Sequence, residues 1–376
     1  MAKSTSYRGY YLACFGIDGD DAISTGIAQK VGNQVNCFND CGLKCEFIHC
    51  KQPLSKIRRG LGSLPGISDG IAWPSATSLR GADYLYIRRP LFSTREFLKL
   101  LREFRQQNPD AKIIIEIPTY PYDQELKTPE LAFAYRKDRK YRKEWKHYVN
   151  RIADLSKHSD IFGIPTIPIV NGVDLKQIRA RTPSYVPNGD INIVFTSFFE
   201  KWHGCDLLIR GLANYYIQGG KRNIRLHLAG GGSELPNLKA LTAKVNLTDR
   251  VLFHGILDRD ASSALFDSCT LAVGSLGLHR IGLTVASTLK TREYLARGIP
   301  FLYAGEIDVL MDRKSDFFLQ IDSSERPVDF NAIVKFHDEL YSNFDEPTVI
   351  ANIRSFAEQT VSVQSGMKDV INYIMS

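Results

Sequence analysis

Short apolar runs of strand length alternate with amphipathic stretches of helix length along almost the whole chain. This alternation is typical of βαβ units, in which helices cover both faces of a parallel sheet. A chain of 376 residues also exceeds what one hydrophobic core usually serves. We therefore expect an α/β fold of two Rossmann-like, doubly wound domains that face one another across a cleft.

A polar connection at 174–189 contains Pro183, Pro187 and Gly189 and separates the two halves. It predicts an N-terminal domain at 1–186, a C-terminal domain at 187–347, and a final helix at 348–376 that crosses back to the first domain. Strands are expected in the first half at 9–15, 44–49, 84–87, 112–117, 161–164 and 167–170, with helices at 26–38, 94–107 and 129–156. In the second half strands are expected at 191–195, 225–228, 251–253, 271–273 and 300–303, with helices at 206–216, 235–244, 261–267 and 289–297.

Basic residues are concentrated in the first half. Up to Tyr185, Lys and Arg outnumber Asp and Glu by ten, whereas acidic residues are in excess by three in the rest. This asymmetry indicates an anionic partner for the first half. The run RKDRKYRKEWK, from Arg136 through Lys146, could lie on an anionic membrane surface or form a solvated helix face. None of the usual nucleic-acid recognition elements is visible, so nucleic acid is not expected.

The cysteines do not suggest a disulfide framework or a metal site. There are seven, an odd number, and no secretory leader or membrane-spanning run is visible, so the expected location is the cytoplasm or the inner face of the cell membrane. Cys37, Cys41, Cys45 and Cys50 lie near His49 but lack paired C-x2-C spacing, so no bound metal is expected.

Three strand-to-helix loops of the second half carry the residues best suited to a ligand, because open α/β sheets bind ligands at the carboxyl ends of their strands. The first, TSFFEKWHG at 196–204, places a hydroxyl group and cations where a helix begins, which favours an anion. A polar surface turn anchored by Trp202 is the alternative. The second, HLAGGGSE at 227–234, either lets the backbone approach a ligand or forms a tight turn into a helix.

The third loop is the most informative. It reads GLHRIGL at 277–283 and continues as ASTLKTREYLARGIP at 286–300. Ser287 or Thr288 is expected to cap a helix whose free N–H groups, with Lys290 in the first turn, suit a diphosphate. Glu293 lies one turn further along, where a carboxylate can accept hydrogen bonds from the two adjacent hydroxyl groups of a ribose.

The order of these segments resembles the C-terminal domain of retaining GT-B glycosyltransferases of the family-four type, which build bacterial polysaccharides and glycolipids. That pattern has a basic KG turn, a Gly-rich turn with a V-x-F-x-G strand end, and a segment E-x-F-G-L…L-E-A-x-A-x-G-x-P. The matching segments are KWHG at 201–204, Gly230 with VLFHG at 251–255, and EYLARGIP at 293–300. The resemblance covers most of 191–303 and implies the GT-B fold and a nucleotide diphosphate sugar donor, with UDP expected as the nucleotide.

The resemblance also implies roles for individual residues. Lys201 or His203 and the helix start at 287–290 would hold the diphosphate, the backbone at 254–256 would read the base, and Glu293 would hold the ribose. A glycine where the first helix of the chain begins, Gly26, would let the backbone approach the donor. The predicted donor-binding residues are Gly26, Ser197, Lys201, His203, Gly230, His254, Gly255, Ile256, Arg280, Ser287, Thr288, Leu289, Lys290 and Glu293.

Two departures from the family pattern affect the expected chemistry. The first Glu of the family's Glu pair, which touches the donor sugar, falls at His279, which we include among the catalytic candidates. The Arg that usually precedes the basic turn appears as Ser197. The neighbouring pair of His279 and Arg280 is expected to supply the missing positive charge.

The acceptor is expected to bind the first half. The loop IEIPTYPYDQE at 115–125 follows a predicted strand, and Asp123 or Glu125 could orient an acceptor hydroxyl or accept its proton. Tyr120, Tyr122 and Arg88 are the predicted acceptor contacts. A Pro-rich turn with solvated acids is the alternative for this loop.

Together these features predict a hexosyltransferase that moves a sugar from a nucleotide diphosphate sugar to a saccharide or lipid-linked saccharide acceptor in polysaccharide biosynthesis, with retention. Protein cations and the helix dipole would stabilise the leaving diphosphate, so no cofactor is expected. Two alternatives remain open. One is a nucleotide-sugar epimerase of the same architecture, and the other is a non-catalytic subunit that binds nucleotide or a partner enzyme.

Overall fold

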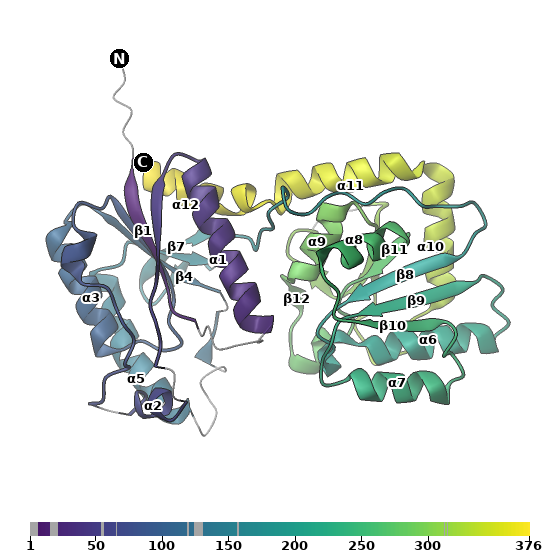
Figure 1. Ribbon diagram of the computed structural model, residues 1–376, viewed down its shortest axis with the longest axis horizontal. Coiled ribbons are helices and arrows are strands. Elements are labelled where there is room, and N and C mark those ends of the chain that lie inside the picture. The colour runs from purple at the N-terminus through teal and green to yellow at the C-terminus, as the bar shows by residue number, and fades with distance from the viewer. Residues whose placement is uncertain are drawn as a thin grey trace, which may run out of the picture. The chain divides into compact units, whose positions relative to one another are not determined.

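The computed structural model has two compact units (Figure 1). Unit 1 comprises Met1–Val170 with Gly366–Ser376, and unit 2 comprises Asn171–Ser365. The residues that the structure describes are 7–15, 22–53, 56–64, 66–118, 120–123, 131–155, 158–311, 313 and 315–376. The division falls at 170 rather than near Pro187, because the connection at 174–189 contributes Arg181 to unit 2. The Arg181 guanidinium is buried and donates to the Glu346 carboxylate at 2.5 Å.

Unit 1 is built on a seven-stranded sheet of order β2-β1-β3-β4-β5-β7-β6. The strands are β1 (Arg8–Ala13), β2 (Lys44–His49), β3 (Tyr84–Arg88), β4 (Lys112–Ile117), β5 (Arg151–Asp154), β6 (Asp160–Ile161) and β7 (Ile164–Pro168). Neighbouring strands are parallel except the β6–β7 pair. The nearly continuous apolar sequence of the central strands is the pattern of a sheet buried on both faces.

Helices cover both faces of this sheet. They are α1 (Ala22–Asp40), α2 (Lys56–Leu61), α3 (Arg95–Gln107), α5 (Ala132–Tyr141) and α12 (Val363–Met375), with 3-10 turns η1 (Ala76–Leu79) and η3 (Arg142–His147). Phe97, Leu101 and Phe104 of α3 pack into one core. The far end of the chain is tied to β4, because the Lys112 ammonium donates to the carbonyl of Tyr373 at 2.6 Å.

Unit 2 has a parallel six-stranded sheet of order β10-β9-β8-β11-β13-β15. Its strands are β8 (Ile191–Thr196), β9 (Ile224–Ala229), β10 (Val251–Gly255), β11 (Leu271–Val273), β13 (Phe301–Ala304) and β15 (Phe318–Ile321), and a small separate pair joins β12 (Val285–Ala286) to β14 (Glu306–Ile307). The first strand, β8, lies beside the fourth, β11, so the strand order reverses between them. This is the Rossmann order, and the reversal is the point at which such sheets bind ligands.

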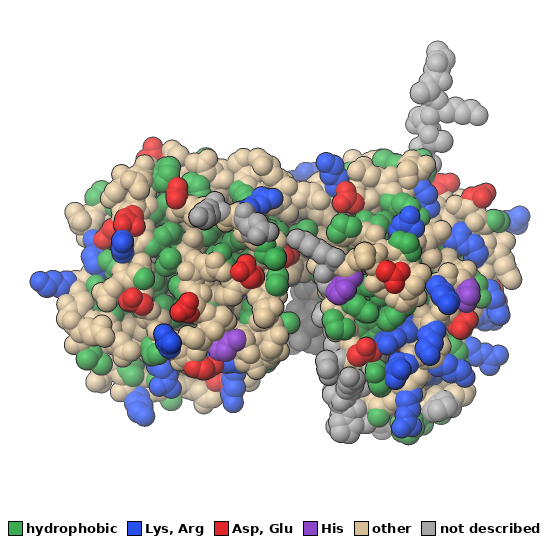
Figure 2. Space-filling model, turned by 180° about the vertical axis from the view of Figure 1, so that it is seen from behind, with side chains coloured by type: hydrophobic (Ala, Val, Ile, Leu, Met, Phe, Trp, Pro, Cys, Tyr) green, Lys and Arg blue, Asp and Glu red, His purple; other side chains and the backbone are tan. Residues whose placement is uncertain are grey.

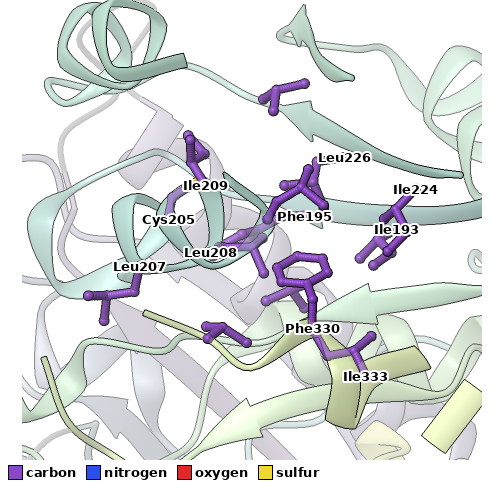
Figure 3. Close-up of a cluster of buried hydrophobic side chains, with 14 of the residues drawn as sticks. Ile193, Phe195, Cys205, Leu207, Leu208, Ile209, Ile224, Leu226, Phe330 and Ile333 are labelled. Carbon is purple, nitrogen blue, oxygen red and sulfur yellow. The ribbon is translucent and has the colours of Figure 1, made fainter. Parts of the chain in front are cut away.

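Two cores enclose the unit 2 sheet. The helices are α6 (Cys205–Ile217), α7 (Leu235–Lys244), α8 (Arg259–Asp267), α9 (Leu289–Arg297), α10 (Phe330–Asn343) and α11 (Glu346–Thr360), and the 3-10 turns are η4 (Lys201–His203) and η5 (Leu278–Ile281). Helices α6, α7 and α10 pack on one face, where Leu208, Phe195 and Phe330 meet (Figure 3). Helices α8, α9 and α11 contribute to the other core.

The α/β class and the parallel sheets predicted from the sequence are confirmed, but some elements differ. The helix expected at 129–156 is divided into α5, η3 and strand β5, because Ile152 and Ala153 are buried beside β4. The strand expected at 161–164 is a tight β6–β7 hairpin, in which Phe162 and Gly163 have positive φ. The final helix is interrupted at 361–362, and only Gly366–Ser376, which includes most of α12, belongs to unit 1.

Candidate functional site

The candidate site lies where β8 and β11 of unit 2 end, beneath the start of helix α9. The buried Tyr294 of α9 fixes this arrangement through two hydrogen bonds. Its hydroxyl accepts from the Thr196 N–H at 3.2 Å and donates to the carbonyl of Val273 at 3.0 Å. One helical turn earlier, Lys290 occupies the same face of α9. The two strand ends therefore meet a lysine whose position is set by a buried tyrosine.

Lys290 is a partly buried cation. Its ammonium donates to the Ser197 hydroxyl at 3.0 Å and lies 4.7 Å from the centre of the Phe195 ring. No carboxylate among the residues described by the structure forms an ion pair with it. Burial lowers its pKa to about 7. An ammonium with a hydroxyl and an aromatic ring as neighbours gains more from a bound anion than one already paired with a carboxylate.

The first turn of α9 adds backbone donors beside Lys290. Thr288 is the N-cap, with extended φ and ψ, but its side chain makes no cap hydrogen bond; its hydroxyl lies 3.2 Å from that of Thr291. Within the described part of the chain, the N–H groups of Leu289 and Lys290 have no acceptor. Free N–H groups at the positive end of a helix dipole favour an anion.

Ser287 has a structural role as well. Its hydroxyl accepts from the buried Arg292 at 3.2 Å, and its carbonyl accepts from Asn171 at 3.1 Å. Arg292 also pairs with Asp308. These contacts fix the segment that leads into α9. Arg292 and Asp308 were not among the predicted site residues, because nothing in their spacing distinguishes them from solvated charges.

The third part of the site is His203, whose ring is uncharged. The Glu200 N–H donates to Nδ1 of His203 at 3.0 Å, in a reciprocal capping box around η4. Burial, and after it the charge of Lys290, lowers the pKa of His203 to about 3. Since Nδ1 accepts, the proton of the neutral ring is on Nε2. His203 is therefore a neutral donor, whereas Lys201 is exposed.

The Gly-rich turn after β9 is required by packing inside the protein. Gly230 has φ of 135°, and a Cβ atom there would lie 1.8 Å from the carbonyl oxygen of Ser197. Gly232 is limited in the same way by the backbone of Phe199 at 2.4 Å. These contacts support the interpretation of the segment as a tight turn into a helix. The turn still serves the site indirectly, since it positions Ser197.

An apolar surface lies beside this turn at the end of β10. Ile256 is 80% exposed and Phe198 is 57% exposed. A Cβ atom on Gly231 would lie 3.6 Å from both side chains, so the three residues form one surface. His254 is exposed and lies 3.0 Å from His227, whose ring it stacks on. The exposed side chains and the backbone at 254–256 suit the flat face of a nucleotide base.

Glu293 and Arg280 are held by contacts that the sequence did not indicate. Oε1 of Glu293 accepts from Nε of Arg297 at 2.9 Å and from a terminal nitrogen at 2.8 Å, and its carboxylate is 29% exposed. Arg280 donates to Asp206, to Glu325 and to the Lys201 carbonyl, with all of its nitrogens engaged. Donor contact by Arg280 would require one of these bonds to break.

His279 lies beside a carboxylate from a distant part of the chain. Its Nε2 donates to Oε1 of Glu325 at 2.7 Å, and Ser323 lies 3.3 Å from its Nδ1. Hydrogen bonds from Arg280 and His279 lower the pKa of Glu325 to about 2. A carboxylate is thus present next to the position where the family has its first Glu. Sequence reasoning missed Glu325, because it lies 46 residues after His279 and only the fold brings it there.

The predicted acceptor residues of unit 1 have mixed environments. Tyr122 is fully buried and its hydroxyl donates to Asp138 at 3.1 Å, so it has no exposed surface to offer an acceptor. Asp123 accepts from Arg142 at 2.9 Å, so one of its carboxylate oxygens already has a partner. Tyr120 packs edge-on against His158 at 4.9 Å. Glu125 lies outside the described residues.

Arg88 and Gly26, the two other residues predicted for unit 1, have structural roles there. Arg88 donates to the buried Glu116 at 2.9 Å, and Lys30 pairs with the same carboxylate at 3.0 Å. Gly26 lies inside α1 rather than where that helix begins, since α1 starts at Ala22. A helix tolerates an internal glycine at a cost of about 1 kcal/mol. Gly26 is therefore an interior residue of α1 and does not mark where the helix begins.

The described residues contain no group of three His, Cys, Asp or Glu side chains placed to hold a metal ion. Cys37, Cys45 and Cys50 are buried, and burial raises the pKa of the Cys45 thiol to about 11. None of the helices in the described ranges combines the length and apolarity needed to cross a bilayer.

The chain is similar to known proteins in part of its sequence and in its fold. Residues 177–300 match the family model described as Glycosyl transferases group 1. No curated protein sequence matches the chain. A glycosyltransferase from Rickettsia africae ESF-5 is similar over 99% of both chains, with a TM-score of 0.63 and 11% identity. The chain has the GT-B fold.

Two further GT-B structures extend the comparison. Sucrose-phosphate synthase from Thermosynechococcus elongatus is similar over 98% of this chain and 99% of its own, with a TM-score of 0.63 and 13% identity. HepE from Anabaena, solved in complex with UDP, covers the same shares with a TM-score of 0.59 and 12% identity. Together with the matched segment at 177–300, which includes β8 through α9, these similarities support a GT-B glycosyltransferase.

Proposed function

We propose that the protein is a hexosyltransferase of polysaccharide biosynthesis. It transfers the hexose of a nucleotide diphosphate sugar, with UDP as the nucleotide, to a saccharide or lipid-linked saccharide acceptor. One observation carries the proposal: the partly buried Lys290 ammonium lies beside free N–H groups of α9, at the point where the strand order of unit 2 reverses. A diphosphate supplies the negative charge that this arrangement lacks.

The donor fits the remaining features of the site. The diphosphate would contact Lys290, the α9 backbone and Nε2 of His203. The base would lie on the surface made by Phe198, Gly231 and Ile256, and the ribose would reach Oε2 of Glu293, since Oε1 is held by Arg297. HepE was solved with UDP and with UDP-glucose, which supports a UDP-sugar as donor.

The leaving diphosphate would be stabilised by protein groups alone. Lys290, His203 and the α9 N–H groups act on the charge that develops as the bond between sugar and diphosphate breaks. We propose that no metal cofactor is needed, and that the configuration at the sugar carbon is retained. If turnover were abolished by EDTA and restored by a divalent cation, the metal-free part of the proposal would fail.

Calorimetric titration with UDP and GDP tests the donor site. UDP is expected to bind the intact chain, and Lys290→Met is expected to weaken it by about tenfold or more, since hydrogen bonds to charged groups contribute about 1.5–3 kcal/mol. Lys221→Met is the matched control, because Lys221 is exposed just before β9, at the opposite end of the strands. Absence of binding at millimolar concentration, or equal affinity in both variants, would refute the assignment.

Activity measurements separate transfer from the two other interpretations. A transferase releases UDP faster when an acceptor is present. Epimerised donor after incubation without acceptor would identify an epimerase, and donor binding with no transfer or hydrolysis would identify a binding subunit. Retention is checked by the anomeric configuration of the product.

A further inference from the structure

Unit 1 contains a cavity of about 400 Å³ that the proposed function does not use. Gln52 and Pro53, which line it, follow β2, and Pro90 and Phe92 follow β3. The cavity therefore lies at the carboxyl edge of the unit 1 sheet, where open α/β sheets bind ligands. Its volume is within the range of small-molecule sites.

The chemistry of the cavity wall is apolar. The apolar residues that line it are Pro53, Ile71, Pro90, Leu91, Phe92 and Leu131. Asp69 also faces the cavity, but its carboxylate already accepts from Ile71 N–H at 2.9 Å, from the Trp73 indole at 3.2 Å and from the Thr94 hydroxyl at 2.5 Å. The Ser63 hydroxyl donates to the carbonyl of Gly60 at 2.7 Å.

These occupied polar groups limit what the cavity can bind. A sugar or a nucleotide needs several hydrogen-bond partners when it is buried. Among the described residues of the wall, the Asp69 carboxylate and the Ser63 hydroxyl are already engaged, which leaves Gln52 as the one further polar side chain. A hydrocarbon chain needs no hydrogen-bond partner. Leu91 lines the cavity and is 48% exposed, so the apolar wall continues to the protein surface.

The helix that begins at the cavity is strongly basic on its exposed side. Leu131 of the wall is the N-cap of α5. Along α5 and η3, the exposed cations are Arg136, Arg139, Lys140, Lys143 and Lys146. Lys137 and Arg142 of the same run are buried, and Lys137 donates to the carbonyls of Gly62 and Ile67 at 2.7 Å. In Figure 2, Lys and Arg side chains gather on unit 1, which lies at the right of that view.

We propose that this cavity binds the hydrocarbon chain of a lipid-linked acceptor with an anionic head group, and that the exposed cations of α5 attract the head. The inference rests on the proposed function and specifies its acceptor class as an anionic amphiphile. It also changes the interpretation of the basic run. Trp145 is fully buried, with its indole donating to Ser93 at 3.0 Å, so the run binds charge while the neighbouring cavity supplies the apolar contact.

Binding of alkyl phosphates below their micelle concentration tests the inference. Affinity is expected to rise roughly fourfold for each added methylene from butyl to octyl phosphate, because a buried methylene contributes about 0.8 kcal/mol. Inorganic phosphate should bind far more weakly than octyl phosphate. Equal affinity across the series would overturn the proposal.

Substitution of Leu91 assigns the chain to this cavity. Leu91→Gln places an amide in the wall and is expected to remove the dependence on chain length, whereas Leu91→Met should preserve it. Ile217→Gln is the matched control, since Ile217 is 82% exposed at the end of α6 in unit 2. If Leu91→Gln bound the series as the intact chain does, the cavity would not be the site.

Two further measurements separate related outcomes. Lys290→Met should lose affinity for UDP but still bind octyl phosphate. Leu91→Gln should bind UDP but lose affinity for octyl phosphate, so failure of the donor site and failure of the lipid site are distinguishable. Flotation with phosphatidylglycerol vesicles distinguishes an acceptor from bulk membrane lipid. An acceptor site predicts equal flotation of the intact chain and Leu91→Gln; weaker flotation of the variant would overturn the acceptor assignment.

Discussion

Lys290 donates to the hydroxyl of Ser197 across the gap between the start of α9 and the end of β8, at 3.0 Å. Ser197 carries no charge, and a hydroxyl stabilises an ammonium less than a carboxylate does. Burial consequently lowers the pKa of Lys290 to about 7. The pair holds a cation ready for an anion, and this state has measurable consequences.

The affinity for UDP should fall as pH rises above neutrality. In the free protein Lys290 has a pKa of about 7, and a bound diphosphate raises it, so binding above pH 7 takes up a proton. Between about pH 7.5 and 9.5, where the phosphate groups of UDP are ionised, the affinity should decrease by up to about tenfold per unit. Lys290→Arg removes the titration and should give a flat profile. A profile that falls equally in both proteins would contradict the role of Lys290.

The neutral donor at His203 can be tested with two amides. His203→Asn keeps an acceptor near the Nδ1 position for the Glu200 N–H but removes the Nε2 donor, and should weaken UDP by about tenfold. His203→Gln places an amide nitrogen near the Nε2 position and should lose only about threefold. Calorimetry at pH 7 measures both. Equal affinities would show that Nε2 does not reach the diphosphate.

Gly230 should be replaceable only at a large loss of stability. Gly230→Ala would place Cβ 1.8 Å from the Ser197 oxygen at a φ of 135°, and is expected to lower the free energy of unfolding by at least about 2 kcal/mol. Its neighbour is the control: Gly231→Ala meets nothing closer than 3.6 Å and should change it by about 0.5 kcal/mol or less. Urea denaturation compares them, and similar values would contradict the packing argument.

Glu293 has a structural and a proposed binding role, and two variants separate them. Glu293→Ala leaves the buried Arg297 without its carboxylate and should cost about 1–3 kcal/mol of stability. Glu293→Gln keeps an acceptor for Arg297 and should fold with a smaller loss. If Glu293 holds the ribose, Glu293→Gln should reduce the preference for UDP over 2′-deoxy-UDP, measured by calorimetry. An unchanged preference would leave Glu293 with the structural role alone.

The sequence by itself determined the alternation of strands and helices and therefore the α/β class. It also indicated the loops that gather at the carboxyl edge of unit 2, because parallel strands place all their following loops at one edge. Lys290 could be selected because it falls in the first turn of a predicted helix, and His203 because its turn resembles the basic turn of the family. The strand β5 was missed because a short apolar run beside a basic helix is ambiguous in period.

Only the tertiary structure decided the state of each side chain. Arg280, Glu325 and Asp206 form one network although they are far apart in sequence, and Tyr122 is buried while its neighbour Tyr120 is not. The cavity behind Leu91 is likewise formed by loops after different strands. Such features depend on which long-range contacts surround a group, and burial and charge pairing have no signature in local sequence. The hydrophobic periodicity of the sequence therefore determined the sheet edges at which a ligand can bind. Tertiary packing decided which side chains at those edges are free to bind it.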